Sequence, residues 1–587
     1  MSSPLLDIKN LQTDFTTEDG KITAIKDVGF TLNRGETIGI VGESGSGKSV
    51  TALSIMRLLS KAGNVSQGEI NFFNEQGIPS NLLSLTEAEM RKYRGNEIAM
   101  IFQEPMTSLN PVISCGKQVA EALVLHKKIS KQEARQRTIA LFEKVKLPRA
   151  EKLFDSYPHQ ISGGQKQRVL IAMAMSCDPA ILIADEPTTA LDVTVQSAIL
   201  DLLQKLQQEK NMGMLFITHD LGVISEIANS IVVMYKGQVV EIGTTTQIFN
   251  DPKHPYTKAL LACRPPLHKR LHRLPTIIDF MKENSDGTFT EINKSINESI
   301  NHLEISNDEI TKHRKRIFSQ EPILQVKNLH TWFPIRNGLF GKTTDHIKAV
   351  NDISFDVYPG ETLGLVGESG CGKTTLGRSI IRLIEPTSGK VIFKNKDLSM
   401  LEGNELRRMR KHIQIIFQDP YSSLNPRMKI GQAIMEPMKV HRLHDNDIHR
   451  RKKVIDLLER VNMNESHFNR YPHEFSGGQR QRICIARVLA LQPEFIICDE
   501  SVSALDVSIQ AQVLNLLNEL KRDFNFTYIF ISHDLSVVKF MSDRMIVMNQ
   551  GQIEEIGDPD EIYTSPKSDY TKRLIDAIPG SVSHIQS

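Results

Sequence analysis

Short runs of apolar, largely β-branched residues recur along the chain, and each ends at a glycine-rich turn or at an acidic or histidine residue. The runs Thr37–Val41, Ile181–Ala184 and Met214–Thr218 contain almost no strongly polar side chains. Near-continuous apolar runs of about five residues are typical of parallel strands that are covered by helices on both faces. They therefore predict an α/β core.

The pattern becomes helical between Gln103 and Ser162, where charged residues are spaced through segments such as Lys131–Lys146. This predicts a helical subdomain inserted into the α/β core. No run approaches 18 apolar residues, so the pattern predicts no membrane-spanning helix. The start, MSSPLLDIKN, lacks a charged region followed by an apolar one, and we expect no signal peptide.

The whole pattern occurs twice. GESGSGKS at Gly42 is repeated as GESGCGKT at Gly367, and ISGGQKQR at Ile161 is repeated as FSGGQRQR at Phe475. From there on, matched residues are 314 positions apart, as in the pairs Ser162 and Ser476, Glu186 and Glu500, and His219 and His533. A repeat of this length is a duplicated domain, because solenoid repeats are far shorter. We expect one domain in 1–262, a linker in 263–320 and a second domain in 321–587.

The linker is polar, but Ile292, Ile296, Ile300 and Leu303 recur in it at helical spacing. Two interpretations stay open: a short amphipathic helix that lies against one domain, or a flexible tether. The basic run Lys312–Arg316 is most simply a solvated part of this segment.

Composition narrows the possibilities. The chain has 587 residues, 40% of them hydrophobic, with 71 Lys plus Arg against 69 Asp plus Glu. That length suits two large globular domains, and the balanced charge argues against a dedicated nucleic-acid binder. The six cysteines form no CxxC pair, which suits a reducing cytoplasm, and Cys177, Cys484 and Cys498 lie in or beside apolar runs, as buried residues do.

The repeated glycine-rich turn has the chemistry of a phosphate-binding loop. G-x-x-x-x-G-K-[ST] between a strand and a helix aims successive backbone N–H groups at phosphate oxygens. Gly42, Gly45 and Gly47 let the chain curl closely, Lys48 supplies a charge for the β and γ phosphates, and Ser49 offers a hydroxyl to Mg²⁺. The same roles fall in the second copy to Gly367, Gly370, Gly372, Lys373 and Thr374.

Two further motifs complete a nucleotide hydrolysis site. The apolar run from Ile181 ends in Asp185, placed to hold Mg²⁺, and Glu186, placed to orient or deprotonate a water molecule; Asp499 and Glu500 repeat the pair. The residues Ser162–Gln165 and Ser476–Gln479 (SGGQ) open helical runs, and a helix N-terminus is an anion site. Taken alone, the acids and SGGQ could each be only helix caps.

In this order, the motifs resemble those of the ATP-binding cassette (ABC) ATPases. The resemblance covers both repeats and implies two P-loop NTPase domains, each with a RecA-like α/β core, an antiparallel β subdomain and a helical subdomain. It implies ATP and Mg²⁺ as ligands, and two cassettes that face each other head to tail. Each phosphate loop would then be completed by the signature, the SGGQ motif, of the other cassette.

Carried over residue by residue, the resemblance defines two composite sites. Site one would join Lys48, Ser49, Gln103, Asp185, Glu186 and His219 with Ser476, Gly477 and Gly478. Site two would join Lys373, Thr374, Gln418, Asp499, Glu500 and His533 with Ser162, Gly163 and Gly164. Gln103 and Gln418 would also reach Mg²⁺, and further nucleotide contacts would come from Ser44, Val50, Gln165, Ser369, Cys371, Thr375 and Gln479. Phe15 and Phe333 match the aromatic that stacks on adenine, although ordinary strand residues facing a core would give the same pattern.

Several segments resemble the peptide-importer branch of the family. They are Gln103–Pro105 running into Ser108–Pro111, its copy in Gln418–Pro426, His254–Thr257 (HPYT) and Asp569–Thr571 (DYT). This branch implies two permease subunits, an external solute-binding protein, no nucleic acid, no separate ATPase partner and a place on the cytoplasmic face of the inner membrane. Only Cys263 follows the HPYT segment, so we expect no iron–sulfur cluster. The rival interpretation is a soluble tandem cassette that acts on ribosomes or DNA.

One cysteine lies inside the second phosphate loop. Cys371 is close in sequence to Lys373 and to the start of a predicted helix, and such surroundings lower a thiol pKa. A reactive thiol and a silent replacement for the equivalent Ser46 are equally compatible with the sequence.

Overall fold

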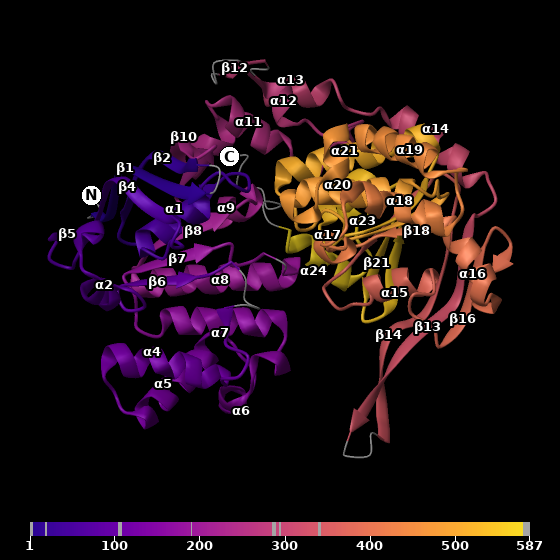
Figure 1. Cartoon of the computed structure of the whole chain (residues 1–587). Helices are drawn as coiled ribbons and strands as arrows, with labels where there is room; N and C mark the ends of the chain where they lie inside the picture. Colours follow the sequence, from indigo (N-terminus) through magenta and orange to yellow (C-terminus); the bar gives the residue numbers. More distant parts are fainter. Residues whose placement is uncertain are drawn as a thin grey trace. The chain divides into compact units, whose positions relative to one another are not determined.

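The computed structural model describes residues 4–17, 20–103, 108–189, 191–284, 289–292, 295–337 and 342–578. They form two compact units, coloured mainly indigo to magenta and orange to yellow in Figure 1. One unit holds the described residues up to Leu261 and those of 280–294. The other holds 262–279 and the described residues of 295–578.

The first unit is built on a six-stranded sheet in the order β10-β9-β3-β8-β7-β6, in which only β10 runs antiparallel to its neighbour. Every residue of β3, β7 and β8 is buried, as the apolar runs predict. The strands are β3 (Thr37–Val41), β6 (Ile98–Ile101), β7 (Ile181–Asp185), β8 (Gly213–Thr218), β9 (Ser230–Tyr235) and β10 (Gln238–Thr244).

An antiparallel sheet, β2-β1-β4-β5, completes the β structure of this unit, with β1 (Pro4–Thr17), β2 (Gly20–Asn33), β4 (Gly63–Phe73) and β5 (Pro79–Asn81). Its main helices are α1 (Lys48–Met56), α2 (Glu87–Tyr93), α4 (Cys115–Lys127), α5 (Lys131–Lys144), α6 (Ala150–Asp155), α7 (Gly163–Met175), α8 (Val193–Lys210), α9 (Leu221–Ile227), α10 (Thr245–Asn250) and α11 (Pro255–Ala262). The group α4, α5 and α6 is the predicted helical insertion.

The second unit repeats this architecture, with sheets β14-β13-β16-β17 and β18-β19-β20-β15-β21-β22. Its strands are β13 (Leu324–Asn337), β14 (Lys342–Val357), β15 (Thr362–Val366), β16 (Ser388–Phe393), β17 (Lys396–Asp397), β18 (Ile413–Ile416), β19 (Phe495–Asp499), β20 (Thr527–Ile531), β21 (Arg544–Asn549) and β22 (Gln552–Gly557). Its main helices are α15 (Lys373–Ile380), α16 (Gly403–Arg410), α17 (Pro420–Ser423), α18 (Ile430–Val440), α19 (Asp447–Arg460), α20 (Gly477–Leu489), α21 (Val507–Phe524), α22 (Leu535–Met541), α23 (Pro559–Thr564) and α24 (Asp569–Asp576). The predicted fold class is thus confirmed in both halves.

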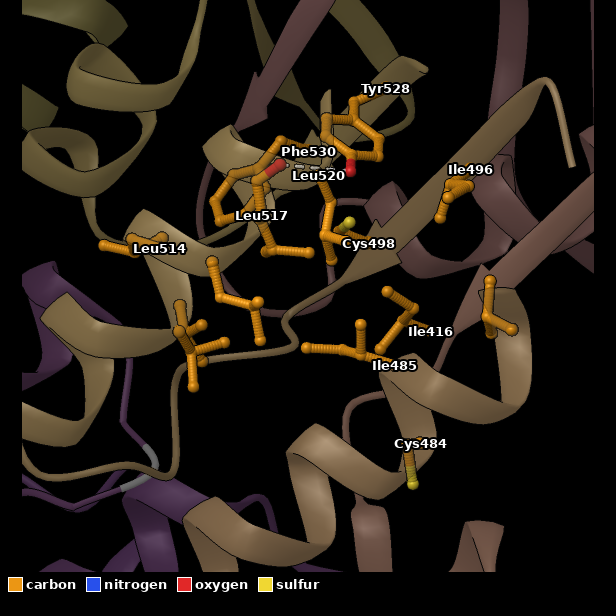
Figure 2. Close-up of a cluster of buried hydrophobic side chains, with 14 of the residues drawn as sticks. Ile416, Cys484, Ile485, Ile496, Cys498, Leu514, Leu517, Leu520, Tyr528 and Phe530 are labelled. Carbon is orange, nitrogen blue, oxygen red and sulfur yellow. Dashed lines mark hydrogen bonds between the residues drawn. The ribbon is translucent and has the colours of Figure 1, made fainter. Parts of the chain in front are cut away.

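A core of buried side chains joins the sheet and helices of the second unit. Figure 2 shows part of it, which includes Cys498 on β19, Phe530 on β20, and Leu514 and Leu517 on α21. The buried Tyr528 hydroxyl donates a hydrogen bond to the Leu517 carbonyl oxygen at 3.2 Å. Cys177, Cys484 and Cys498 are buried, as predicted. None of the described helices combines the length and apolar character needed to cross a bilayer.

The segment between the two repeats contains short helices and strands. It contains α12 (Ile277–Phe280), β11 (Met281–Glu283), β12 (Phe289–Glu291), α13 (Ile296–Asn301) and α14 (Asn307–Phe318). Leu271 and Leu274 are buried in the core of the second unit, and Ile300 and Leu303 pack against it. The packed-helix interpretation therefore holds for this part of the linker, whereas Ile292 is 51% exposed.

Polar contacts fasten the same segment to the second unit. Leu274 donates its N–H to Asn515 Oδ1 at 2.7 Å, and Asn515 Nδ2 donates to the Leu274 carbonyl oxygen at 2.8 Å. Arg270 Nε pairs with Asp560 at 2.7 Å, and Arg314 pairs with Asp558. Arg314 lies in the basic run that the sequence suggested to be solvated, so that interpretation is wrong for this residue.

The Asn515 contact gives a prediction with a matched control. Asn515→Ala leaves a buried backbone N–H and C=O of Leu274 unpaired, which costs about 1–3 kcal/mol. The free energy of unfolding of the second unit should fall by this amount, and trypsin should cut more readily after Arg270 and Arg273. The single tryptophan, Trp332, lies in that unit, so its fluorescence during denaturant unfolding measures the change.

The control is Asp201→Ala. Asp201 occupies the matching position of α8, 314 residues earlier, and is exposed. Its removal should change stability by less than about 0.5 kcal/mol. If both variants unfold and are cleaved alike, Asn515 does not anchor the linker.

Candidate active sites

Each glycine-rich loop follows a buried parallel strand and opens a helix: β3 leads to α1, and β15 leads to α15. Gly47 and Gly372 cap these helices with φ of 100° and 109°, which side chains disfavour. A Cβ atom would also lie 2.4 Å from Ile25 Cγ2 at Gly47 and 2.0 Å from the Ala349 carbonyl oxygen at Gly372. Only glycine fits either position.

The loop lysines are buried and point back into their own loops. Lys48 Nζ donates to the carbonyl oxygens of Gly42 at 2.7 Å and Glu43 at 2.9 Å. Lys373 Nζ makes the same bonds to the carbonyl oxygens of Gly367 at 2.7 Å and Glu368 at 2.8 Å. An ammonium group held inside a curl of backbone is suited to a phosphate chain.

The residue after each lysine reaches the predicted metal-binding aspartate. Ser49 Oγ lies 3.1 Å from Asp185 Oδ1, and Thr374 Oγ1 lies 2.8 Å from Asp499 Oδ1. Burial raises the pKa of Asp185 to about 6 and also raises the pKa of Asp499. Asp499 Oδ2 is buried without a hydrogen-bond partner among the described residues.

The first candidate catalytic glutamate adopts a strained backbone conformation. Glu186 has φ of 48°, a region that non-glycine residues rarely adopt, at a cost of about 1–2 kcal/mol. Its N–H donates to the Ile217 carbonyl oxygen of β8 at 2.9 Å. Gln103 Nε2 donates to its Oε2 at 3.2 Å, Thr189 Oγ1 donates to the same oxygen at 2.9 Å, and His219 Nδ1 lies 3.4 Å from Oε1.

The second cassette repeats this cluster. Glu500 has φ of 47° and donates its N–H to the Ile531 carbonyl oxygen at 3.0 Å. Gln418 Nε2 donates to its Oε2 at 2.8 Å, and His533 Nδ1 lies 3.6 Å from the same atom. The predicted glutamine, glutamate and histidine are therefore brought together in both cassettes.

Electrostatics keep these glutamates charged. Burial opposes ionisation, but hydrogen bonds from His219 and Thr189 outweigh it and lower the pKa of Glu186 to about 2. The pKa of Glu500 is lowered against the effect of burial by His533, whose own pKa is raised by Glu500 in spite of its burial. A carboxylate that is charged at neutral pH can accept a hydrogen bond from water.

The SGGQ motifs begin helices, as predicted. Ser162 caps α7 by accepting from the Gln165 N–H at 3.3 Å, and Ser476 caps α20 by accepting from the Gln479 N–H at 3.4 Å. In return, the glutamine side chains accept from the serine N–H groups. The cap and the anion site are compatible, because a cap leaves other first-turn N–H groups free to point outward.

The aromatic candidates lie on the antiparallel sheets. Phe333 is 38% exposed and Phe15 is half-buried, so Phe333 does not face a core. The sequence did not predict a role for Thr189, although its hydroxyl side chain lies only three positions after Glu186.

Residues 104–107 of the predicted importer segment lie outside the described residues. The pairing of each phosphate loop with the opposite signature stays a prediction.

The structure contradicts the lowered thiol pKa expected for Cys371. The side chain is 6% exposed, and burial raises its pKa although Lys373 acts in the opposite direction. Lys373 Nζ is 3.8 Å from Sγ, but the ammonium donates its shorter bonds to backbone carbonyl oxygens. The sequence shows the neighbouring charge of Lys373 but does not show the loss of solvent around the thiol.

Comparison with known families agrees with the geometry. A model described as ABC transporter matches residues 25–189 and 350–503, more than half of the chain. The chain belongs to the ABC transporter family. A second model, described as the C-terminal region of oligopeptide and dipeptide transporters, matches residues 240–286. The family recognised from the motifs is thereby confirmed.

Curated relatives extend over nearly the whole chain. The glutathione import ATP-binding protein GsiA of Salmonella choleraesuis is 48% identical over 580 residues, which are 98% of this chain and 90% of the relative. The same-named protein of Escherichia coli K12 is 49% identical over 583 residues, 98% and 89% of the two chains. Among solved structures, cbiO1 from Clostridium perfringens matches 42% of this chain and 92% of its own at 27% identity, with a TM-score of 0.36.

These findings decide between the two functional interpretations. The chain is an ATP-binding, ATP-hydrolysing subunit of an importer and works with membrane permease components. The rival, a soluble tandem cassette acting on ribosomes or DNA, is rejected.

Burial of Cys371 gives a prediction. In the native chain, iodoacetamide should alkylate Cys371 at least about tenfold more slowly than in the guanidine-unfolded chain, as followed by mass spectrometry of the loop peptide. Cys371→Ser, which copies Ser46 of the first loop, should keep ATP turnover within about twofold. Rapid alkylation that ATP prevents would show that the thiol is accessible and reactive.

Proposed function

We propose that the chain hydrolyses ATP at two composite sites and that both are competent. Site one would join the first phosphate loop, Glu186 and His219 with the signature at Ser476. Site two would join the second loop, Glu500 and His533 with the signature at Ser162. The proposal is supported by the duplicated clusters, since neither cassette lacks a loop lysine, glutamate, histidine or signature serine.

Magnesium fits both cassettes. Ser49 with Asp185, and Thr374 with Asp499, offer the hard oxygen donors that Mg²⁺ prefers, and Asp499 Oδ2 is a buried oxygen without a hydrogen-bond partner among the described residues. These residues, with Gln103 and Gln418, would hold the ion. When bound, it neutralises charge on the β and γ phosphates.

Hydrolysis then depends on the glutamates. Each charged carboxylate accepts a hydrogen bond from the attacking water, and the glutamine and histidine on either side keep it oriented. Lys48 and Lys373 exchange their carbonyl contacts for phosphate oxygens. Bound γ phosphate favours closure of the cassettes, and its loss allows them to part, which is the change that a permease could use.

We further propose that the transported solute is glutathione or another short peptide. The single observation that carries this is the 48–49% identity, over 98% of the chain, to glutathione import ATP-binding proteins. The chain would work on the cytoplasmic face of the inner membrane with two permease subunits and an external solute-binding protein. Solute choice would lie with those partners, because no part of an ATP site recognises the solute.

Removing the carboxylates tests the hydrolysis sites. Glu186→Gln and Glu500→Gln should each lower ATP turnover, and the double variant should lower it by about 10²–10⁴-fold, because an amide cannot accept the water proton. Each should retain bound ATP through gel filtration. Wild-type turnover in either single variant would contradict two competent sites.

The same variant tests the pairing of sites. In Glu186→Gln, retained ATP should be lost when Ser476→Arg is added, because Ser476 would complete the site of Lys48. The matched change Ser162→Arg lies on the other signature and should leave most of the ATP in place. The reverse result would mean that each cassette uses its own signature.

Reconstitution tests the solute. The chain, its permease subunits and the binding protein in proteoliposomes with internal Mg-ATP should accumulate radiolabelled glutathione or a dipeptide. The Glu186→Gln and Glu500→Gln double variant should give no accumulation. Turnover that no added peptide or glutathione stimulates would contradict the proposed solute class.

A further inference from the structure

In the sequence, the HPYT and DYT segments indicate only a resemblance to the peptide-importer branch. In the structure, both segments contact the phosphate loop of their own cassette. The Glu43 N–H donates to the Tyr256 hydroxyl oxygen at 3.0 Å, and the Glu368 N–H donates to the Tyr570 hydroxyl oxygen at 3.0 Å. The two tyrosines are 314 positions apart, in the register of the duplication. The same bond occurs at the same distance in two compact units, so it is a repeated feature of the fold rather than a packing accident.

Both tyrosine side chains are buried. Tyr256 is 0% exposed and Tyr570 is 7% exposed. Each is the second residue of a helix, α11 and α24 respectively. The Tyr256 ring also packs on Tyr235 of β9, with the ring centroids 4.3 Å apart. A buried hydroxyl needs a polar partner, and here that partner is a backbone N–H of the phosphate loop.

An acidic residue holds the segment that carries each tyrosine, and Glu241 is half-buried whereas Glu555 is buried. Glu241 on β10 accepts from the N–H groups of Lys253 at 2.7 Å and His254 at 3.0 Å. His254 Nδ1 then accepts from the Tyr256 N–H at 3.1 Å and so caps the first turn of α11. This chain of bonds fixes where the phenol lies.

The second unit uses the same device with one change. Glu555 on β22 accepts from the N–H group of Lys567 at 3.2 Å and from that of Ser568 at 3.4 Å. Ser568 Oγ takes the place of the histidine and accepts from the Tyr570 N–H at 3.2 Å. Glu241 and Glu555 are again 314 positions apart.

The Tyr256 hydroxyl and the Lys48 ammonium both form hydrogen bonds with the backbone of Glu43. The Glu43 carbonyl oxygen accepts from Lys48, and the Glu43 N–H donates to Tyr256, so this one residue is held from both sides. Lys48 must release its carbonyl contacts when it turns to phosphate. The tyrosine bond does not compete with phosphate and can persist, which would keep the loop curled at that moment.

We propose that Tyr256 and Tyr570 are positioning residues for ATP binding, which tie the start of each phosphate loop to the C-terminal part of its cassette. They act through the loop backbone and need not touch the nucleotide. The proposal rests on the ATP sites proposed above. It gives the HPYT and DYT segments a role inside the ATPase that is separate from contact with any permease.

The test uses the full chain carrying Glu186→Gln and Glu500→Gln, so that Mg-ATP binds without turnover. Adding Tyr256→Phe and Tyr570→Phe together should raise the Kd for Mg-ATP about twofold to tenfold, the worth of one neutral hydrogen bond per site. Hydrogen–deuterium exchange should also become faster in the loop peptides that contain Glu43 and Glu368. Each Tyr→Phe change alone should weaken only one of the two sites.

The matched control is Tyr528→Phe. Its hydroxyl is as buried, and its bond goes to the Leu517 carbonyl oxygen in the core shown in Figure 2. It should lower the unfolding midpoint yet leave the Kd and loop exchange unchanged. An unchanged Kd in the Tyr256 and Tyr570 variant, or an equal rise in the control, would overturn the positioning role alone. A parent chain that binds no Mg-ATP would overturn the ATP sites and this role with them.

Discussion

Four of the parallel strands in the main sheet of each unit carry the proposed site at their carboxyl ends, and the proposed chemistry depends on that alignment. In the first unit the phosphate loop follows β3, Gln103 follows β6, Asp185 ends β7 with Glu186 directly after it, and His219 follows β8. Because neighbouring parallel strands point the same way, residues far apart in sequence meet at their carboxyl ends. The strained φ of Glu186 then turns its carboxylate toward the glutamine and the histidine.

Much of this could be predicted from the sequence because it rests on local patterns. The strand Thr37–Val41 and the helix starts at the SGGQ motifs are written in short stretches of apolar, glycine and capping residues. What could not be predicted depends on contacts between distant segments. The pKa of Cys371 follows from its burial by the whole loop, and the contact of Tyr256 with Glu43 spans 213 positions.

The two cassettes are alike but not identical around their nucleotide sites. Thr189 bonds the carboxylate of Glu186, whereas Ser503 Oγ donates instead to the Glu500 carbonyl oxygen. Arg378 Nη2 lies 3.8 Å from Asp499 Oδ2, and the matching position of the first loop helix is Leu53. Such differences affect charge and orientation rather than the presence of any catalytic group, so they are compatible with two working sites that turn over at different rates.

The segment between the cassettes is divided between the two units, and this affects where the protein can be cut into fragments. Leu271, Leu274 and Ile317 fill space in the core of the second unit, although by motif position they precede it. A recombinant C-terminal half that started at Pro322 would therefore expose an apolar groove and lack a native partner for Asn515. Starting such a fragment near Ala262 keeps those residues, but it also takes residues 280–294 away from the first unit, to which they belong.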